Sequence, residues 1–209
     1  MLETHNRLRG VRVGVVVTGS HCTIGDVIPQ IRDLKSEGAD ILPIFSYTVD
    51  KTDNRFYQVH DLRTQIYEIS NKPIINTIVG AEPIGPQKLL DVVVVAPATG
   101  NTIAKLANGI VDTPALMAVK AHLRNQRPVV IAISTNDALG INARNIGILI
   151  NMKNIYFVPF RQDDPFNKCN SLVASMDKLL DTVVYALQGK QLQPVLLGPE
   201  IGRASCRER

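Results

Sequence analysis

The stretch DVVVVAPATGNT, residues 91–102, decides the fold because it joins a continuous apolar run to a polar turn. Four successive valines lack the polar alternation of a half-exposed strand, so residues 91–96 are predicted to form a strand buried on both faces. The turn leads into apolar residues at helical spacing, which predicts a helix over residues 99–108. A buried strand that runs directly into a helix is the building unit of α/β proteins with a parallel sheet.

The same unit recurs along the chain, where apolar strands and amphipathic helices are separated by Gly-rich, Pro-rich or polar loops. Further strands are predicted at residues 11–18, 39–46, 72–77, 127–133 and 154–158, of which 72–77 is the weakest. Further helices are predicted at residues 24–37, 56–69, 114–124 and 172–187. We predict a single Rossmann-like, doubly wound parallel sheet in one domain over residues 7–189, followed by a C-terminal extension at residues 190–199.

The composition excludes several classes of protein. The chain has 209 residues, of which 45% are hydrophobic and three are cysteines, and its formal net charge is +4. These values exclude disordered, collagen-like and disulfide-stapled chains. No apolar run approaches the about 20 residues of a membrane-spanning helix, and no secretory signal is recognised, so a cytoplasmic protein is expected. Lys and Arg are scattered singly without interleaved aromatic residues, so no nucleic-acid partner is expected.

The last ten residues, EIGRASCRER at positions 200–209, differ from the rest of the chain. They are charged, have no apolar period and resemble the translation of a sequencing adapter. We expect a non-native tail here, and the alternative is a genuine frayed terminus. Without this segment the chain has 20 basic and 17 acidic residues, and its cysteines are Cys22 and Cys169.

Four loops that follow predicted strands are rich in hydroxyl and amide side chains. They occupy residues 18–23, 46–48, 96–102 and 134–137. The carboxyl ends of parallel strands share one edge of the sheet, and ligands bind outside that edge. The Gly19-Ser20 turn would offer free backbone N–H groups and a hydroxyl to a phosphate, although Ser and Thr at such positions also cap helices. Four such loops at one edge predict a nucleotide-like ligand.

Two common phosphate motifs and a metal site are not expected. No G-x-G-x-x-G motif follows Gly19. Gly14 and Gly19 have the glycine spacing of a Walker motif, but the Lys of that motif does not follow them. The four histidines are scattered, and His21 has only Cys22 beside it, without further ligands at metal-site spacing.

The turn after the valine run resembles a known signature. Residues 96–109, APATGNTIAKLANG, followed by Asp112, match the pattern APA(T/S)xNTxxKxAxGxxD of the FMN-binding flavoprotein family. That family includes cysteine decarboxylases and prenyl-flavin synthases. The resemblance implies a flavoprotein-type α/β fold, FMN as the cofactor and assembly into homo-oligomers.

A narrower resemblance, to one branch of this family, extends over about residues 7–195. It rests on TGSHCT, SYTVDKTDNRF, INTIVGAEPIGP, STNDALG, KNIYFVPFRQDDP and ALQGKQLQPV. It implies an oxidoreductase subunit in the cytoplasm of a spore-forming bacterium, acting with a dehydrogenase-like partner subunit that carries NAD(P). The implied reaction is the two-electron oxidation of a dihydropyridine dicarboxylate to an aromatic pyridine dicarboxylate.

The resemblance also implies roles for individual residues. Asn101 matches the functional Asn of the family and is a catalytic candidate, although a helix-start cap is the alternative. The residues implied to bind the cofactor are Gly19, Ser20, Thr23, Ser46, Thr48, Ala98, Thr99, Asn101, Thr102 and Ser134.

The sequence departs from the decarboxylases at two places, and both departures argue against cysteine decarboxylase activity. A His-containing segment before the fourth strand is replaced by PIGP at residues 83–86, and a Pro-x-Met-Asn motif is replaced by STND at residues 134–137.

Other residues are candidates by position alone. Glu82 and Asp137 are the carboxylates best placed as a general base. Cations for a substrate carboxylate are Arg55, Lys105 and Arg144, and candidates for proton transfer are His21 and Cys22. For each residue a solvated or packing role is the alternative.

Three interpretations stay open at this point. The chain is an FMN-binding enzyme subunit, or a non-catalytic scaffold subunit with a vestigial flavin site, or, least favoured, an FMN-dependent decarboxylase.

Overall fold

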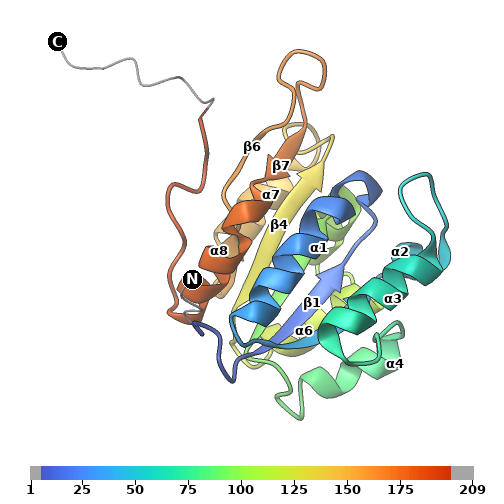
Figure 1. Cartoon of the computed structure of the whole chain (residues 1–209). Coiled ribbons are helices and arrows are strands. Elements are labelled where there is room, and N and C mark those ends of the chain that lie inside the picture. The colour runs from blue at the N-terminus through green and yellow to red at the C-terminus, as the bar shows by residue number, and fades with distance from the viewer. Residues whose placement is uncertain (1–5, 199–209) are drawn as a thin grey trace, which may run out of the picture.

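The computed structural model describes residues 6–198, in which helices cover both faces of a twisted sheet (Figure 1). The expected non-native tail at 200–209 lies outside the described residues. Within residues 6–198, seven strands form the sheet in the order β2-β1-β3-β4-β7-β6, and β5 pairs with β4 beside this path. The strands are β1 (Arg12–Val17), β2 (Asp40–Phe45), β3 (Val92–Ala98), β4 (Val129–Thr135), β5 (Ile155–Phe157), β6 (Phe160–Gln162) and β7 (Leu172–Ala174).

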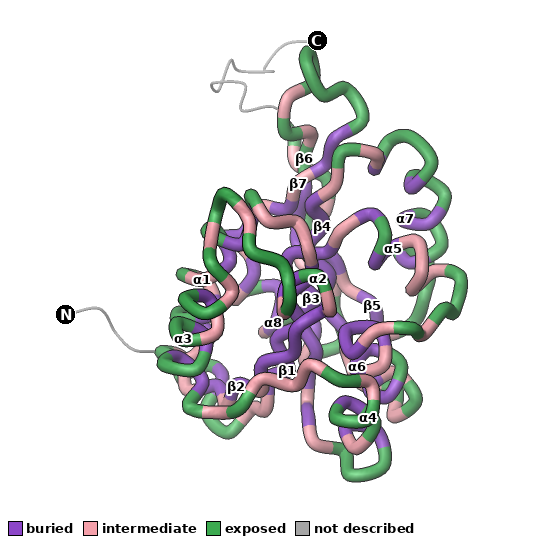
Figure 2. Tube along the Cα trace, turned by 90° about the vertical axis from the view of Figure 1, so that its right-hand side faces the viewer, coloured by how far each residue is buried: buried purple, intermediate pink, exposed green. Residues whose placement is uncertain are grey.

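Strand β3 lies at the centre of the sheet, between β1 and β4. It pairs in parallel with both neighbours, and all seven of its residues are buried, as its valine run predicts. The buried residues form one continuous core along the sheet (Figure 2). The parallel pairings of β1 to β5 confirm the predicted α/β fold.

The longer helices divide between the two faces of the sheet (Figure 1). One face carries α1 (His21–Ser36), α3 (Val59–Ser70) and α8 (Leu179–Leu187); the other carries α5 (Gly100–Ala107), α6 (Pro114–Leu123) and α7 (Ala143–Ile150). The described part of the chain also contains two short helices, α2 (Tyr47–Lys51) and α4 (Ile78–Ala81), and two 3-10 turns, Glu82–Ile84 and Met176–Lys178.

Asp91 anchors the start of β3 at the amino-terminal edge of the sheet. Its carboxylate accepts hydrogen bonds from the backbone N–H of Arg12 at 2.9 Å and from the Arg12 guanidinium at 2.7 and 3.0 Å. Arg127 adds a contact of 3.2 Å. These partners, Arg12 foremost, hold the pKa of Asp91 below its usual value. The residue that opens the valine run therefore links the starts of β1, β3 and β4.

The strand predicted at residues 72–77 is wrong. Ile75 forms only an isolated bridge with Ile44. Pro73 has no N–H to donate to a ladder, and the Thr77 hydroxyl accepts the Gly80 N–H at 3.0 Å, which starts α4. The segment is consequently one short contact at the edge of β2.

The helix predicted at residues 172–187 begins only at Leu179. Leu172 and Val173 instead belong to β7, which pairs antiparallel with Thr135 and Ser134 of β4 and with β6. Helices α2 and α7 and strand β6 were not expected from the sequence. Strand β6 has three residues, and α7 has only eight and contains Gly147, which is a poor helix former, so both elements are short.

The residues after α8 cover two edges of the sheet. The Gln191 amide accepts from the Phe157 N–H at 2.8 Å and donates to the Phe157 carbonyl at 2.7 Å, as a neighbouring strand would. Phe160 makes backbone hydrogen bonds to Val195 at 3.0 Å and Leu197 at 2.9 Å. Backbone groups of β5 and β6 that would otherwise be open to other chains are thereby paired.

His122 is a fully buried residue of α6. Its Nε2 lies 3.1 Å from the Pro128 carbonyl oxygen, which can only accept, so Nε2 carries the proton. Its Nδ1 is buried without a hydrogen-bond partner among the described residues. Burial, above all, lowers the pKa of His122 from 6.5 to about 4.

We expect the free energy of unfolding to fall by about 2 kcal/mol between pH 7 and pH 4.5 through His122 alone. Over this interval the unfolded chain, with the higher pKa, binds a proton that the folded chain does not, so acid favours unfolding. Urea denaturation at pH 7 and at pH 4.5 measures the difference. His122→Asn should reduce the pH dependence, and the exposed control His60→Asn should leave it unchanged; equal slopes in all three proteins would contradict this account.

Candidate functional site

The carboxyl ends of β1 and β3 are joined by Thr18. Its hydroxyl donates to the Pro97 carbonyl at 2.7 Å and accepts the Thr99 N–H at 3.1 Å. From these adjacent strands the chain proceeds to β2 on one side and to β4 on the other, so the strand order reverses here. Open α/β sheets bind ligands in the crevice at such a point. Loops from the ends of β1, β2, β3 and β4 line two pockets at this edge.

The first pocket, termed the hydroxyl pocket, has a volume of about 410 Å³ and lies between the ends of β1, β2 and β3. Seven of its lining residues carry hydroxyl groups: Thr18, Ser46, Tyr47, Thr48, Thr99, Thr102 and Thr113. Lys105 also lines it and forms an ion pair with Asp112 at 2.5 Å. Such a lining can donate many hydrogen bonds to an anionic ligand.

Ser46 stands out among these hydroxyls. It follows β2, is 8% exposed, and its Oγ is buried without a hydrogen-bond partner among the described residues. An unpaired buried hydroxyl costs about 1–3 kcal/mol, which a bound acceptor would relieve. Opposite it, a Cβ on Gly19 would lie 3.2 Å from Cγ2 of Thr48, so glycine keeps the turn after β1 narrow.

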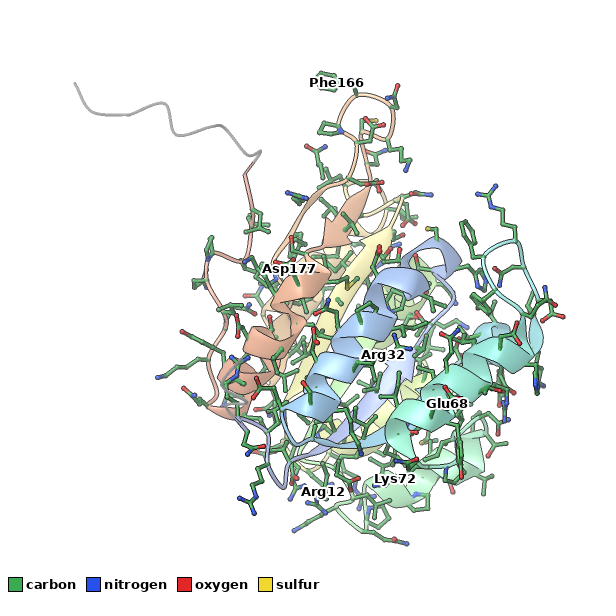
Figure 3. The ribbon with its side chains drawn as sticks, in the orientation of Figure 1. Arg12, Arg32, Glu68, Lys72, Phe166 and Asp177 are labelled. Carbon is green, nitrogen blue, oxygen red and sulfur yellow. The ribbon has the colours of Figure 1, made fainter. Side chains whose placement is uncertain are left out.

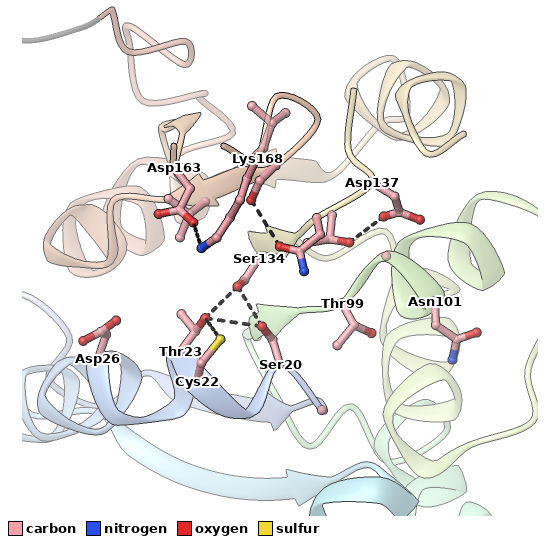
Figure 4. Close-up of a pocket in the computed structure, with 17 residues that line it drawn as sticks. Ser20, Cys22, Thr23, Asp26, Thr99, Asn101, Ser134, Asp137, Asp163 and Lys168 are labelled. Atoms are coloured by element: carbon pink, nitrogen blue, oxygen red, sulfur yellow. Dashed lines mark hydrogen bonds and ion pairs between the residues drawn. The ribbon is translucent and has the colours of Figure 1, made fainter. Parts of the chain in front are cut away.

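The second pocket, termed the hairpin pocket, has a volume of about 520 Å³. It lies between the ends of β1, β3 and β4 and the loop of residues 163–171, which joins β6 to β7 (Figure 4). Gly19, Thr99 and Asn101 line both pockets. A long ligand can therefore contact the two pockets across these three residues.

A triangle of hydroxyls forms one wall of the hairpin pocket. Ser134 Oγ lies 2.8 Å from Ser20 Oγ and 2.7 Å from Thr23 Oγ1, and the last two atoms are 3.3 Å apart (Figure 4). The triangle links the end of β4 to the first turn of α1. These hydroxyls are paired with one another, unlike Ser46, so they shape the pocket at little energetic cost.

Asp137 is held on the opposite wall of the hairpin pocket. Its carboxylate accepts hydrogen bonds from the Thr135 hydroxyl at 2.5 Å and the Asn142 amide at 2.8 Å. Asn142 in turn accepts from Asn145 at 2.8 Å. Gly100, the first residue of α5, packs directly on this network, because a Cβ there would lie 2.5 Å from Asp137 Oδ1.

The structure brings most of the predicted site residues together. The hydroxyl pocket, the hairpin pocket or both are lined by Gly19, Ser20, Thr23, Ser46, Thr48, Thr99, Asn101, Thr102, Ser134 and Asp137. Ala98 is a buried residue of β3 that precedes the turn and is not among the lining residues of either pocket.

Glu82 lies apart from both pockets. It starts a 3-10 turn that packs against α6, and the next residues reach the end of that helix, where Asn125 donates to the Gly85 carbonyl at 2.7 Å. The chain must return to the amino-terminal edge of the sheet before β3, and this takes Glu82 away from the opposite edge. Of the candidate cations, Lys105 lines the hydroxyl pocket, whereas Arg55 and Arg144 line neither pocket.

His21 and Cys22 lie at the start of α1. His21 Nδ1 is 2.7 Å from the Tyr57 hydroxyl, and burial lowers the pKa of His21 below its ordinary value. His21 therefore links α1 to the loop before α3. Cys22 is exposed and lines the hairpin pocket.

Several lining residues were not anticipated from the sequence. Asp163, Lys168 and Ser171 reach the hairpin pocket from the loop between β6 and β7, and Asp26 reaches it from α1. The signal for this loop was the turn sequence Asp164-Pro-Phe-Asn167, in which Asn167 N–H donates to the Asp164 side chain at 3.1 Å.

Neither a metal-binding cluster nor a membrane-spanning helix is found among the residues that the structure describes. Within residues 6–198, no three His, Cys, Asp or Glu side chains gather as a metal site would require. None of the helices described there is long and apolar enough to cross a membrane.

Comparison with known proteins identifies the family. Residues 1–188 match the sequence model described as Flavoprotein. The chain is 50% identical over 190 residues to the B subunit of dipicolinate synthase from Bacillus subtilis (strain 168), covering 91% of this chain and 95% of that protein. The crystal structure of the corresponding B subunit from Bacillus halodurans C superimposes with a TM-score of 0.85 at 49% identity, covering 91% and 98% of the two chains.

A more distant structure shares the fold. Burkholderia xenovorans DmrB, solved in complex with FMN, superimposes with a TM-score of 0.62 at 20% identity, covering 85% of this chain and 96% of DmrB. The family model and the extensive match to the two dipicolinate synthase chains show that the chain belongs to the Flavoprotein family, in the branch formed by the B subunits of dipicolinate synthase.

Proposed function

We propose that this chain binds FMN across the hydroxyl and hairpin pockets and takes part in the oxidation of dihydrodipicolinate to dipicolinate, together with a dehydrogenase-like A subunit. The observation that carries the proposal is the unpartnered Ser46 hydroxyl within a ring of hydroxyl side chains, at the edge where α/β sheets bind nucleotides. Two relatives support the proposal. The chain shares half of its sequence with a B subunit of dipicolinate synthase, and DmrB, which shares the fold, was solved in complex with FMN.

The residues present fit FMN in their chemistry. Ser46, Thr48 and the Gly19 turn would hold the phosphate, since they supply hydroxyl and backbone N–H donors in the hydroxyl pocket. Thr99 and Asn101, which line both pockets, would hold the middle of the molecule. When bound, FMN would supply two-electron redox chemistry.

The chain's own polar groups would then orient the substrate. The oxidation removes two electrons and two protons from the dihydropyridine ring, and the nicotinamide cofactor of the A subunit is the proposed electron acceptor. Asn101 is exposed at the junction of the pockets, where its amide would position the ring. Asp137, held by Thr135 and Asn142, would accept a proton in the hairpin pocket. We also propose, from the resemblance to the flavoprotein family, that this chain assembles into a homo-oligomer.

Reconstitution of the reaction tests this proposal. Dipicolinate formation linked to NAD(P) is measured with the A subunit alone, with this chain alone and with both, each with and without FMN. The full rate is expected only with both subunits and FMN. A full rate from the A subunit alone would contradict any catalytic part for this chain, and a full rate from both subunits regardless of FMN would favour the scaffold interpretation.

Cysteine decarboxylation is not proposed. Residues 83–86 contain no imidazole, and residues 134–137 lack the Met-Asn pair of the decarboxylases. A direct assay of CO₂ release from a peptidyl or pantothenoyl cysteine would detect that activity if this interpretation were wrong.

A further inference from the structure

A β-hairpin projects beyond the carboxyl edge of the sheet and forms the outer wall of the hairpin pocket. It consists of β6, β7 and the loop of residues 163–171, and Phe166 lies at its tip with 96% of its surface exposed (Figure 3). Lys168 extends from this loop back toward the hydroxyls of Thr23 and Ser134 (Figure 4). The loop thus delivers a cation to the pocket.

The loop has a defined internal structure. Asp164 accepts hydrogen bonds from Asn167 through both carboxylate oxygens, at 3.1 and 2.9 Å, and its carbonyl accepts the Lys168 N–H at 2.8 Å. At the base of the loop, the Gln162 amide donates to the Cys169 carbonyl at 2.9 Å. Ser171 is buried, and its hydroxyl donates a hydrogen bond to the side-chain oxygen of Asn136 at 3.4 Å. Lys168 is therefore carried on an ordered turn.

The charges that line the hairpin pocket are unequal. Three carboxylates line it, from Asp26, Asp137 and Asp163, and Lys168 is the one basic residue among the lining residues that the structure describes. Asp137 is bound by Thr135 and Asn142, and Asp163 is paired with Lys168 at 2.9 Å. Together these four residues give the wall a net negative charge, so a dianionic ligand needs direct contact with the one cation, Lys168.

The Lys168–Asp163 ion pair is able to exchange partners. The Lys168 and Asp163 side chains are 54% and 41% exposed, so water competes for both groups and the ion pair is weak. A carboxylate inside the pocket would be less hydrated and would form a stronger, charge-assisted contact with the ammonium group. Asp163 can then turn toward solvent without leaving a buried charge.

We propose that Lys168 is the residue that selects a carboxylate-bearing substrate in the hairpin pocket, and that Asp163 holds its ammonium group in place until that substrate displaces the carboxylate. This inference rests on the proposed function, which assigns a pyridine dicarboxylate to the same pocket. The amides of Asn101 and Asn136, which also line the pocket, supply neutral donors for the second carboxylate.

Substitutions at the two ends of the ion pair should act in opposite directions. In the full chain, Lys168→Gln is expected to raise the Kd for dipicolinate about tenfold or more, because it removes the charge-assisted contact. Asp163→Asn is expected to lower that Kd by about two- to fivefold, because it frees the ammonium group and removes one negative charge. Calorimetric titration measures the Kd for dipicolinate of both variants. Pyridine-2-carboxylate, which has one carboxylate fewer than dipicolinate, is titrated as the comparison ligand.

Lys153→Gln is the matched control, since Lys153 is an exposed lysine that lines neither pocket. It should bind dipicolinate as the wild-type chain does. Failure of the wild-type chain to bind dipicolinate would overturn the inference. So would a weakening by both Lys168→Gln and Asp163→Asn, which would mean that the ion pair only braces the loop.

An FMN titration of the same proteins separates the inference from the proposed function. The Kd for FMN should be equal in the wild type and in the three variants. Normal FMN binding with dipicolinate affinity unaffected by Lys168→Gln would overturn the role of Lys168 and leave the proposed function standing. Absence of FMN binding, with dipicolinate affinity shifted in opposite directions by the two variants, would overturn the FMN proposal alone.

Discussion

Replacing Gly100 by alanine is expected to lower the free energy of unfolding by about 1–3 kcal/mol and to weaken FMN binding tenfold to hundredfold. The new Cβ would lie 2.5 Å from Asp137 Oδ1, 2.6 Å from Thr135 Oγ1 and 2.7 Å from Asn142 Nδ2. These atoms belong to a hydrogen-bonded network at the end of β4, so either this network rearranges or α5 moves away from it. Both shifts change the pockets, because Asp137 lines the hairpin pocket and Thr99 and Asn101, on either side of Gly100, line both pockets.

Gly147→Ala provides the matched control for Gly100→Ala. Gly147 lies within α7, and an added Cβ there would meet nothing within 4 Å. Alanine should stabilise that helix by up to about 1 kcal/mol and leave the Kd for FMN unchanged. Urea denaturation and flavin fluorescence titration measure the two quantities. Equal effects of the two substitutions would contradict the close packing of Gly100 against the Asp137 network.

Ser46→Ala is expected to weaken FMN binding about tenfold without destabilising the chain. The Ser46 hydroxyl is buried and has no partner among the described residues, so its removal relieves a desolvation cost of about 1–3 kcal/mol in the ligand-free protein. With FMN present, the same substitution removes a donor to the phosphate. Stability and affinity should therefore change in opposite directions, as measured by thermal unfolding and by fluorescence titration.

Ser70→Ala is the contrasting variant for Ser46→Ala. Ser70 is 2% exposed, and its hydroxyl donates to the Ile66 carbonyl at 2.8 Å, within α3 and outside both pockets. Its replacement should lower stability by about 1 kcal/mol with no effect on FMN. If Ser46→Ala behaved like Ser70→Ala, the hydroxyl of Ser46 would be structural and would not face a ligand.

The sequence predicts the parallel part of the fold because burial on both faces leaves a continuous apolar run. The valine run of β3 and the similar run of β1 are examples. The antiparallel hairpin could not be predicted in this way. Strands β6 and β7 have three residues each, which is too short for periodicity, and they exist because Leu172 and Val173 pair with the end of β4.

The candidate site, too, could be predicted only in the part that follows the parallel strands. Hydroxyl residues directly after strands are brought to one edge by the parallel topology, so Gly19, Ser46, Thr99 and Ser134 lie around the two pockets. Glu82 could not be placed, because the path between β2 and β3 depends on packing against α6. Lys168 could not be assigned to the site either, since only the hairpin carries it there.

Equilibrium titration of the full chain with FMN, followed by the flavin absorbance and fluorescence, tests the central claim most directly. The account predicts saturable binding of one FMN per chain, with the affinity reduced in Ser46→Ala and unchanged in Ser70→Ala. Spectra of FMN that remain those of the free flavin at a large excess of protein would contradict it.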